Sequence, residues 1–405
     1  MKSEMLDARL NQIEKLRQPI LDAAEEAQEL RRLPEGIVDR LVQDGFFRFA
    51  LPSALGGEEA SSLDTIAVLE TIAAIDASVA WNVMLGSEIN AMAAGGMEES
   101  IAKQIYLDHP EVIMCGGGGP GTTPARAERQ QDGSVRLWAQ ATFISGCHNA
   151  HWCFLAAPLM RGKEPETDAH GQPIFKLWML ARDQWEILDT WDVAGLRGSG
   201  SHDVKADGGL VRPEHVDVDL VEIPPKYDNP VFRIPIPLRL SYNKVAIALG
   251  VAKGALETFS DLAQNKIPLM STSSLANRPI AQIRMGEAMG QYRSARAFVF
   301  EAMGAIEDEL YAGAPYPGAK TTQDARLACV HAANVCMNVV DMLHNTAGTT
   351  GMRMNSPLER KLRDAHGCAT HRWVSHPLYQ DLGAILLGND APPEFAGNLG
   401  GPMPR

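Results

Sequence analysis

The sequence predicts a mostly helical α+β protein with an N-terminal helical domain (1–110), a middle antiparallel, barrel-like β domain (111–228) and a C-terminal four-helix bundle (229–405). Two observations support this division. Apolar residues recur at spacings of three and four in the first and last thirds of the chain, which is typical of helices. Between them, short runs alternate apolar with polar residues, which is typical of strands.

Composition narrows the class of protein. Of 405 residues, 45% are hydrophobic and 21% charged, as in ordinary globular proteins. The net charge of −13 argues against binding nucleic acid or anionic lipid. We expect no membrane segment, because no apolar run reaches about 20 residues, and no signal peptide, because the charged N-terminus lacks an apolar core. The six cysteines form no CxxC pair, so we expect buried thiols in a cytoplasmic protein and no metal site.

The first third predicts several helices. Leu10, Ile13, Leu16 and Ile20 form one apolar stripe. Pro34 suits the first turn of a second helix, which Gly45 ends. We expect a third helix over 63–84, a break at 95–96 and a further helix to about residue 107.

The middle third predicts strands separated by polar turns. Alternating runs occupy 135–144, 152–157, 175–181, 185–188 and 216–223. Within the first run, the inward positions are expected to be Val135, Leu137, Ala139, Ala141 and Phe143. Five prolines between 224 and 237 predict an extended linker.

The last third carries four apolar stripes with helical spacing, joined by short connections. The stripes begin at Val245, Ala288, Ala325 and Leu358 and end at Phe259, Ile306, Leu343 and Ala369. Such a pattern predicts an antiparallel four-helix bundle. Its seams are rich in alanine, so we expect the helices to pack closely.

One stretch, 139–152, is the strongest candidate for a binding site. It is a predicted strand that ends abruptly in Ser145-Gly146. A strand end of this kind offers free backbone N–H groups and one hydroxyl, which suit a flat heteroaromatic ring better than a metal or a phosphate. The alternative is an ordinary polar turn, because turns favour the same residue types.

Two further loops are candidates for the walls of such a site. The glycine-rich segment 115–124 contains no GK[ST] and is not part of a strand–GxGxxG–helix unit, so we expect a lid or a pocket wall there rather than a phosphate loop. The segment 189–203 joins the planar face of Trp191 to a small polar loop at 196–201. The alternative for this second loop is a surface hairpin.

The C-terminal third adds histidines. The loop 344–351 could offer backbone donors to a ligand. His366, His371 and His376 are spaced by five residues and cannot share one helical face, and no HExxH pattern is present. We therefore exclude a metal site, which leaves a catalytic histidine or a hydrogen-bonded structural one.

With these residues assembled, the chain resembles the acyl-CoA dehydrogenase superfamily over nearly its whole length. The most specific pieces are the segment 191–201, similar to the family's GLRGTGS loop, together with Ser356-Pro357-Leu358-Glu359-Arg360 and Arg363-Asp364-Ala365. The resemblance implies the three-part fold given above, with flavin bound between the β domain and the bundle.

One departure from the family pattern decides the branch. The dehydrogenases carry a glutamate base shortly after the RDA segment, whereas this chain has His371-Arg372-Trp373 there. The resemblance is therefore to the flavin-dependent monooxygenases of the same fold. It implies reduced flavin (FADH2 or FMNH2) supplied by a separate reductase, O2 as co-substrate, and hydroxylation of a small aromatic substrate through a flavin C4a-hydroperoxide. An indole such as indole-3-acetate, or a phenol, would be the substrate.

Two alternatives remain open: an acyl-CoA dehydrogenase with a displaced base, and a non-enzymatic helical scaffold.

The resemblance also implies roles for individual residues. Ser145 and Gly146 would lie against the pyrimidine and N5 side of the flavin, where Ser145 would keep N5 hydrogen-bonded. His371, titrating near neutrality, would act on the substrate, so the implied catalytic residues are His371 and Ser145. The other implied cofactor-binding residues are Trp191, Ser199 and Ser201 from the β domain and Gly348, Thr349 and Thr350 from the bundle. Arg278 would reach the flavin phosphates of a neighbouring subunit, which implies a homotetramer or homodimer.

Overall fold

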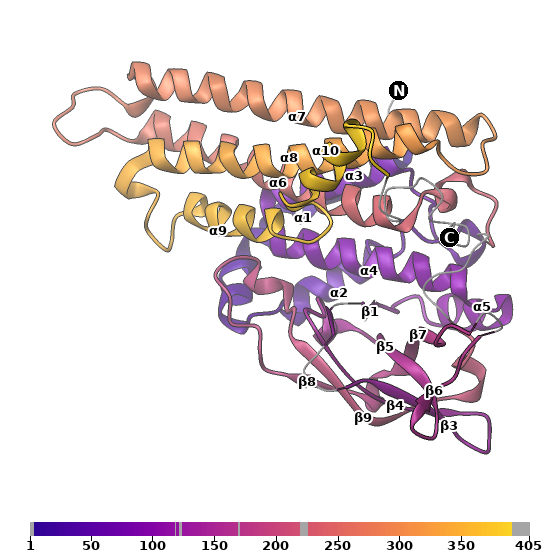
Figure 1. Ribbon diagram of the computed structural model, residues 1–405. Coiled ribbons are helices and arrows are strands. Elements are labelled where there is room, and N and C mark those ends of the chain that lie inside the picture. Colours follow the sequence, from indigo (N-terminus) through magenta and orange to yellow (C-terminus); the bar gives the residue numbers. More distant parts are fainter. Residues whose placement is uncertain (1–3, 118, 121–123, 169–170, 219–225, 391–405) are drawn as a thin grey trace.

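The computed structural model describes residues 4–117, 119–120, 124–168, 171–218 and 226–390. Helices, a β-sheet and a helical bundle follow one another along the chain, as predicted. Figure 1 shows the bundle on one side of the molecule, the sheet on the opposite side and helix α4 between them. The domain boundaries at 110 and 228 stay predictions.

The N-terminal part contains five helices in the described residues: α1 Glu4–Leu30, α2 Glu35–Gln43, α3 Ser62–Ile75, α4 Ala77–Gly96 and α5 Glu99–Leu107. The single helix expected over 63–84 is therefore two. The break lies at Asp76, whose backbone is extended (φ −144°) and whose carboxylate accepts the N–H groups of Ser78 and Val79. Asp76 thus caps α4, while the apolar pattern runs on unbroken across the kink.

In the residues that the structure describes, the middle part is a curled nine-stranded sheet: β1 Met114–Gly116, β2 Gly119–Pro120, β3 Arg126–Arg129, β4 Val135–Thr142, β5 Trp152–Arg161, β6 Glu164–Pro165, β7 Phe175–Ala181, β8 Glu186–Leu188 and β9 Asp203–Val211. The main strand order is β1-β5-β3-β4-β9-β8. Most pairings are antiparallel, but β5 pairs in parallel with β1 and β3, so the expectation of an antiparallel sheet holds only in part. The reason is that β5 returns to lie between two strands that precede it.

Two strand predictions need correction. Strand β9 was not predicted, because Gly208-Gly209 interrupts its alternating pattern. Val216 and its neighbours to 218 follow the short 3₁₀ helix Pro213–His215 and form no strand. The rest of the run expected to 223, and two of the prolines of the expected linker, lie outside the described residues.

The C-terminal part contains the predicted bundle: α6 Ile236–Asn265, α7 Pro279–Tyr311, α8 Ala319–Ala347 and α9 Pro357–Ala369, followed by α10 Leu378–Leu386. The predicted stripes are buried, as Leu249, Val299 and Cys329 illustrate. The stretch Ala319–Thr350 is long and apolar enough to cross a membrane, by length and composition only. Half of its most apolar window is buried, and α8 packs against α6, α7 and α9 as a core helix of the bundle.

Glycines bring the N-terminal helices and the bundle into close contact. A Cβ on Gly250 of α6 would lie 2.4 Å from the carbonyl oxygen of Glu70, and a Cβ on Gly254 would lie 2.2 Å from that of Ala74. Only glycine permits α3 and α6 to approach this closely. All six cysteines are buried free thiols, as expected.

Candidate functional site

The site begins where β4 ends. Phe143, directly after Thr142, has a left-handed backbone (φ +61°) and a side chain that is 66% exposed, whereas Ile144 is fully buried. The expectation that Phe143 points inward was therefore wrong, because the left-handed residue shifts the alternation by one and Ile144 takes the buried place. A left-handed, exposed phenylalanine is unfavourable by itself, and such strain is concentrated at functional sites.

Gly146 holds the next turn in a conformation that requires glycine. Its φ is +69°, and a Cβ there would lie 3.0 Å from Oδ1 of Asn82 on α4. Its N–H donates to the carbonyl of Ser199 at 3.0 Å. The Ser145–Gly146 turn and the Ser199 loop are therefore held together against α4.

The three predicted serines lie together. Oγ of Ser145 is 2.6 Å from Oγ of Ser201, which is 2.7 Å from Oγ of Ser199. The indole N–H of Trp81, on α4, donates to Oγ of Ser145 at 3.0 Å. Ser199 and Ser201 are buried, whereas Ser145 is partly exposed. Of the three hydroxyls, that of Ser145 is therefore the one accessible to a ligand.

Trp191 extends this surface. Its indole N–H donates to the carbonyls of Leu196 and Arg197 at 3.2 and 3.1 Å, so its own loop fixes the ring. The rings of Trp191 and Phe143 meet edge to face, with centroids 6.0 Å apart. A partly buried and an exposed aromatic ring thus adjoin the Ser145 turn.

His371 approaches from the bundle side, in the turn after α9. Its ring meets the ring of Trp81 edge-on, with centroids 5.6 Å apart. Burial, helped by the positive charge of Lys244, lowers the pKa of His371 to about 3. The expectation that His371 titrates near neutrality was therefore wrong, and its ring is neutral at physiological pH. Nδ1 accepts the backbone N–H of Trp373 at 3.4 Å, which places the ring proton on Nε2.

A buried ion pair joins α4 to α6 in the same region. Nζ of Lys244 lies 2.7 Å from Oε1 of Glu88, and both side chains are almost fully buried. The side-chain amide of Asn243 donates to the other oxygen of Glu88 at 2.5 Å. Lys244 of this pair carries the positive charge that helps to lower the pKa of His371.

In the part of the chain that the structure describes, the bundle residues predicted to bind the cofactor form no hydrogen bond with the Ser145 turn. Arg278 immediately precedes α7, and Gly348–Thr350 form a 3₁₀ turn immediately after α8. Both lie at the end of the bundle where α6 ends. Lys266, directly after α6, donates to the carbonyl of Ala347 at 2.6 Å, and its own carbonyl accepts the N–H of Leu275, three residues before Arg278, at 2.7 Å. Among the described residues, no hydrogen bond or ring contact joins this bundle end to Ser145, Trp191 or the buried serines.

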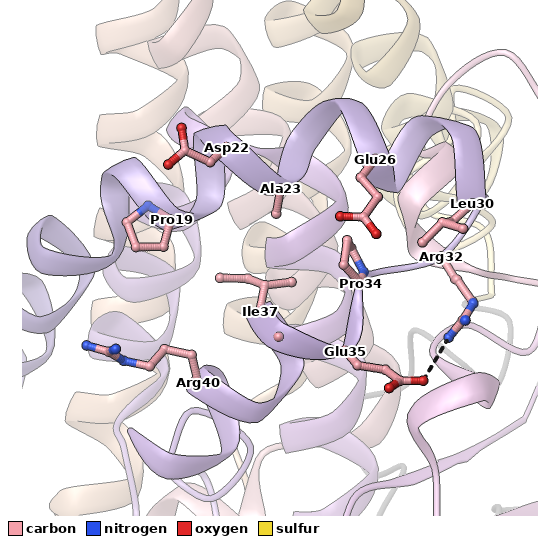
Figure 2. A pocket seen from close by; sticks show the side chains of 11 residues that line it. Pro19, Asp22, Ala23, Glu26, Leu30, Arg32, Pro34, Glu35, Ile37 and Arg40 are labelled. Atoms are coloured by element: carbon pink, nitrogen blue, oxygen red, sulfur yellow. Dashed lines mark ion pairs between the residues drawn. The ribbon is translucent and has the colours of Figure 1, made fainter.

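A separate hollow of about 670 Å³ lies between α1 and α2 (Figure 2). Its walls carry charges of both signs, and one of its arginines, Arg32, is 4.0 Å from Glu35. No aromatic side chain lines it. An apolar ring system prefers apolar, aromatic walls, so this hollow suits a flat heteroaromatic ligand less well than the Ser145 turn does.

Comparison with protein families identifies the fold. The N-terminal domain model of acyl-CoA dehydrogenases matches residues 9–107, and the C-terminal domain model matches 243–376. The chain belongs to the acyl-CoA dehydrogenase family. The RDA segment of this family has a structural role here: Asp364 accepts the N–H of Leu196 at 2.7 Å, and Arg363 donates to the carbonyl of Ala194.

Within the family, the similar proteins are monooxygenases and hydroxylases. An indole-3-acetate monooxygenase of Acinetobacter baumannii is 29% identical over 89% of each chain. The oxygenase component of a p-hydroxyphenylacetate 3-hydroxylase from the same species is 25% identical over 95% of this chain and 90% of the relative. The structure of XiaF from Streptomyces, in complex with FADH2 and glycerol, superimposes with a TM-score of 0.83 at 20% identity, over 96% of each chain. The predicted assignment to the monooxygenase branch is confirmed.

Two residues were given no role in the site from the sequence. Phe143 was placed at an inward position of a strand, and Trp81 lies within the helix expected over 63–84. Nothing in a single sequence shows that Trp81, 64 positions before Ser145, donates to it. The glycine-rich segment 115–124, predicted as a lid or wall, includes residues 118 and 121–123, which lie outside the described residues.

Proposed function

We propose that this chain is the oxygenase component of a two-component system that uses reduced flavin and O2 to hydroxylate a small aromatic compound, with an indole such as indole-3-acetate as the first candidate and a phenol as the second. The observation that carries the proposal is the convergence of Ser145, Trp81 and His371 in a family member that has histidine where the dehydrogenases have a glutamate base. The similar indole-3-acetate monooxygenase supports the choice of an indole.

The residues present fit a flavin. Phe143 and Trp191 offer aromatic surface to a flat ring, and Ser145, a partly exposed residue, lies beside them. Reduced flavin would supply the electrons that activate oxygen. Ser145 and Gly146 would hold the ring edge, Ser199 and Ser201 would hold Ser145, and Gly348–Thr350 and Arg278 would complete the site from the bundle. His371, neutral and with its proton on Nε2, would donate a hydrogen bond on the substrate side.

The dehydrogenase alternative needs a free carboxylate at the site. The buried carboxylates that the structure describes there have partners: Glu88 pairs with Lys244, and Asp364 accepts from Leu196. Asp76 caps α4. None of them has the freedom of a base that takes a proton from an acyl thioester, and this favours the monooxygenase.

A second copy of the chain would complete the site. The bundle end that carries Arg278 exposes large apolar side chains, which a soluble monomer rarely gathers in one place. They are Ile267, Leu269, Met270, Ile280, Ile283, Met352 and Met354. We therefore propose a homotetramer or homodimer joined at this bundle end, so that Arg278 reaches the cofactor of a neighbouring subunit.

Two further parts of the proposal concern the partner protein and the cellular compartment. The similar hydroxylase is named an oxygenase component, and a component of this kind needs a separate flavin reductase. The six free thiols suit a reducing compartment, and we propose that the protein is cytoplasmic.

The experiment that tests the function supplies the protein with a generic flavin reductase, NADH, and FAD or FMN, and screens a panel of indoles and phenols. We expect substrate-dependent oxygen uptake and a product heavier by one oxygen atom. The control is Ser145→Ala, which should release hydrogen peroxide in place of product.

Two further measurements, titration of the flavin-loaded protein with an acyl-CoA and a melting temperature with and without flavin, decide between the alternatives. Bleaching of a bound yellow flavin by an acyl-CoA, without hydroxylation of any compound, would establish a dehydrogenase. The absence of any flavin-induced rise in melting temperature would indicate a scaffold.

A further inference from the structure

We propose that Trp81 and Ser201 are positioning residues that fix the hydroxyl of Ser145 as a hydrogen-bond donor toward the cofactor. The inference rests on the proposed function for the identity of the ligand, but the orientation itself follows from the contacts within the protein. It concerns the direction of one hydrogen atom, which decides what kind of atom Ser145 can hold.

The first constraint comes from Trp81. An indole N–H can only donate, so at 3.0 Å it occupies one lone pair of the Ser145 oxygen. Trp81 is only 5% exposed and lies within α4, so its ring is held in place. The Ser145 oxygen therefore accepts one hydrogen bond permanently.

The second constraint comes from the chain of hydroxyls. The bonds from Ser145 to Ser201 and from Ser201 to Ser199 can run in either of two directions. If Ser145 donated to Ser201, either Ser201 would donate to Ser199 and the hydrogen of Ser199 would need an acceptor, or Ser199 would also donate to Ser201 and the hydrogen of Ser201 would need one. Among the described residues, the Oγ atoms of Ser199 and Ser201 have no hydrogen-bond partner outside this chain of hydroxyls, and the two residues are 1% and 4% exposed.

The opposite direction leaves no buried hydrogen unpaired. Ser199 then donates to Ser201, and Ser201 donates to Ser145. Because an unpaired buried donor is costly, this second direction is favoured. Both lone pairs of Ser145 are then occupied, by Trp81 and Ser201, and its own hydrogen is the one left over.

Ser145 is therefore restricted to donating, and only to an atom that carries a lone pair. Ring nitrogens and carbonyl oxygens of a flavin are such atoms. Ser201 need not contact the cofactor to influence it, because removing its hydroxyl frees a lone pair of Ser145 and lets that hydroxyl turn.

The first test needs no cofactor. The indole N–H signal of Trp81 is recorded by ¹H–¹⁵N correlation in the full-length protein, and it is assigned with Trp81→Phe. We expect this signal to move in Ser145→Ala and in Ser201→Ala. An unmoved signal in both variants would overturn the proposed contact.

The second test measures the affinity for oxidised and, anaerobically, dithionite-reduced FAD and FMN. Ser201→Ala should weaken binding about tenfold, because one hydrogen bond is misdirected. Ser201→Thr, which keeps the hydroxyl, should bind flavin with the affinity of the unchanged protein. Ser294→Ala, at an exposed position of α7 outside the site, is the control and should keep the affinity within about twofold. Equal affinity of Ser201→Ala and the unchanged protein would overturn the inference. If the unchanged protein binds no flavin, the proposed function fails, whereas the contact between Trp81 and Ser145 is still decided by the Trp81 signal.

Discussion

The backbone N–H of Leu196 donates to Oδ1 of Asp364 at 2.7 Å, and this bond joins the loop of Trp191 and the buried serines to helix α9 of the bundle. Gly195 adds to the junction, since a Cβ there would lie 2.1 Å from the carbonyl oxygen of Arg363. Buried contacts therefore fix the position of the β-domain side of the proposed site relative to the bundle side.

Asp364→Asn should change how stability depends on pH. Burial, with the nearby charge of Asp76 adding to it, raises the pKa of Asp364 from 3.8 to about 6. A carboxyl whose folded pKa is raised binds more protons folded than unfolded, so stability falls as the pH rises from about 4 to about 6. At about 1.4 kcal/mol per pH unit, this loss is on the order of 3 kcal/mol.

The measurement is the free energy of unfolding by urea at pH 4 and pH 7. The side-chain oxygen of the asparagine variant can still accept the backbone N–H of Leu196. Between pH 4 and pH 7 the variant should therefore lose less stability than the unchanged protein. Asp261→Asn, at an exposed position of α6, is the control and should leave the dependence as it was. Parallel dependences for Asp364→Asn and the unchanged protein would refute the role of Asp364.

His371 should contribute no ionisation to the activity between pH 5 and pH 8, because its pKa lies at about 3. The sign for stability is opposite to that of Asp364. A base whose folded pKa is lowered binds fewer protons folded than unfolded, so stability falls as the pH drops below about 6.5, by up to roughly 5 kcal/mol near pH 3. Nuclear magnetic resonance titration of the His371 ring checks the value directly.

Variants separate the role of His371 as a donor from a role as a base. His371→Ala should lower product formed per flavin oxidised about 100-fold and raise free peroxide. His371→Gln, whose amide can still donate, should retain part of the coupling. Full coupling in the alanine variant would remove His371 from the site.

Gly146→Ala should weaken flavin binding more than the backbone conformation alone explains. Alanine at a left-handed position costs about 1–2 kcal/mol, and at Gly146 the new Cβ would also press on Asn82. Gly162→Ala is a matched control, because Gly162 has φ +66° with open space around it. Flavin titration of both variants should show a loss for Gly146→Ala only; an equal effect of the two would contradict the packing argument.

Glu88→Gln should destabilise the protein by about 3–5 kcal/mol, because it leaves the ammonium of Lys244 buried without its carboxylate. The double variant Glu88→Gln with Lys244→Met removes both charges and should recover much of that loss. It should also raise the pKa of His371, since a positive charge that acts on the ring is gone. Urea unfolding and ring titration measure the two effects. An unchanged His371 pKa would exclude Lys244 as a cause.

The parts of the fold that were predictable were those with regular spacing. The stripes of α6, α7 and α8 are exact enough in period to predict a bundle, and Ser145-Gly146 marks the end of a strand. Asp76 and Phe143 were missed for one physical reason: each changes the backbone direction at a single residue while the apolar pattern continues through it. Trp81 and Lys244 were missed because long-range contacts carry no local signal. The ionisation of His371 was misjudged because it depends on burial, which only the structure shows.

The most direct test of the central claim is a single-turnover reaction with ¹⁸O2. The protein is loaded anaerobically with reduced FAD or FMN and an indole or phenol from the screen, and then mixed with labelled oxygen. Mass spectrometry of the product should show one ¹⁸O atom from the gas and none from water. Oxidation of the flavin with release of hydrogen peroxide and no hydroxylated product, for every substrate offered, would contradict the account. So would a product whose oxygen comes from water.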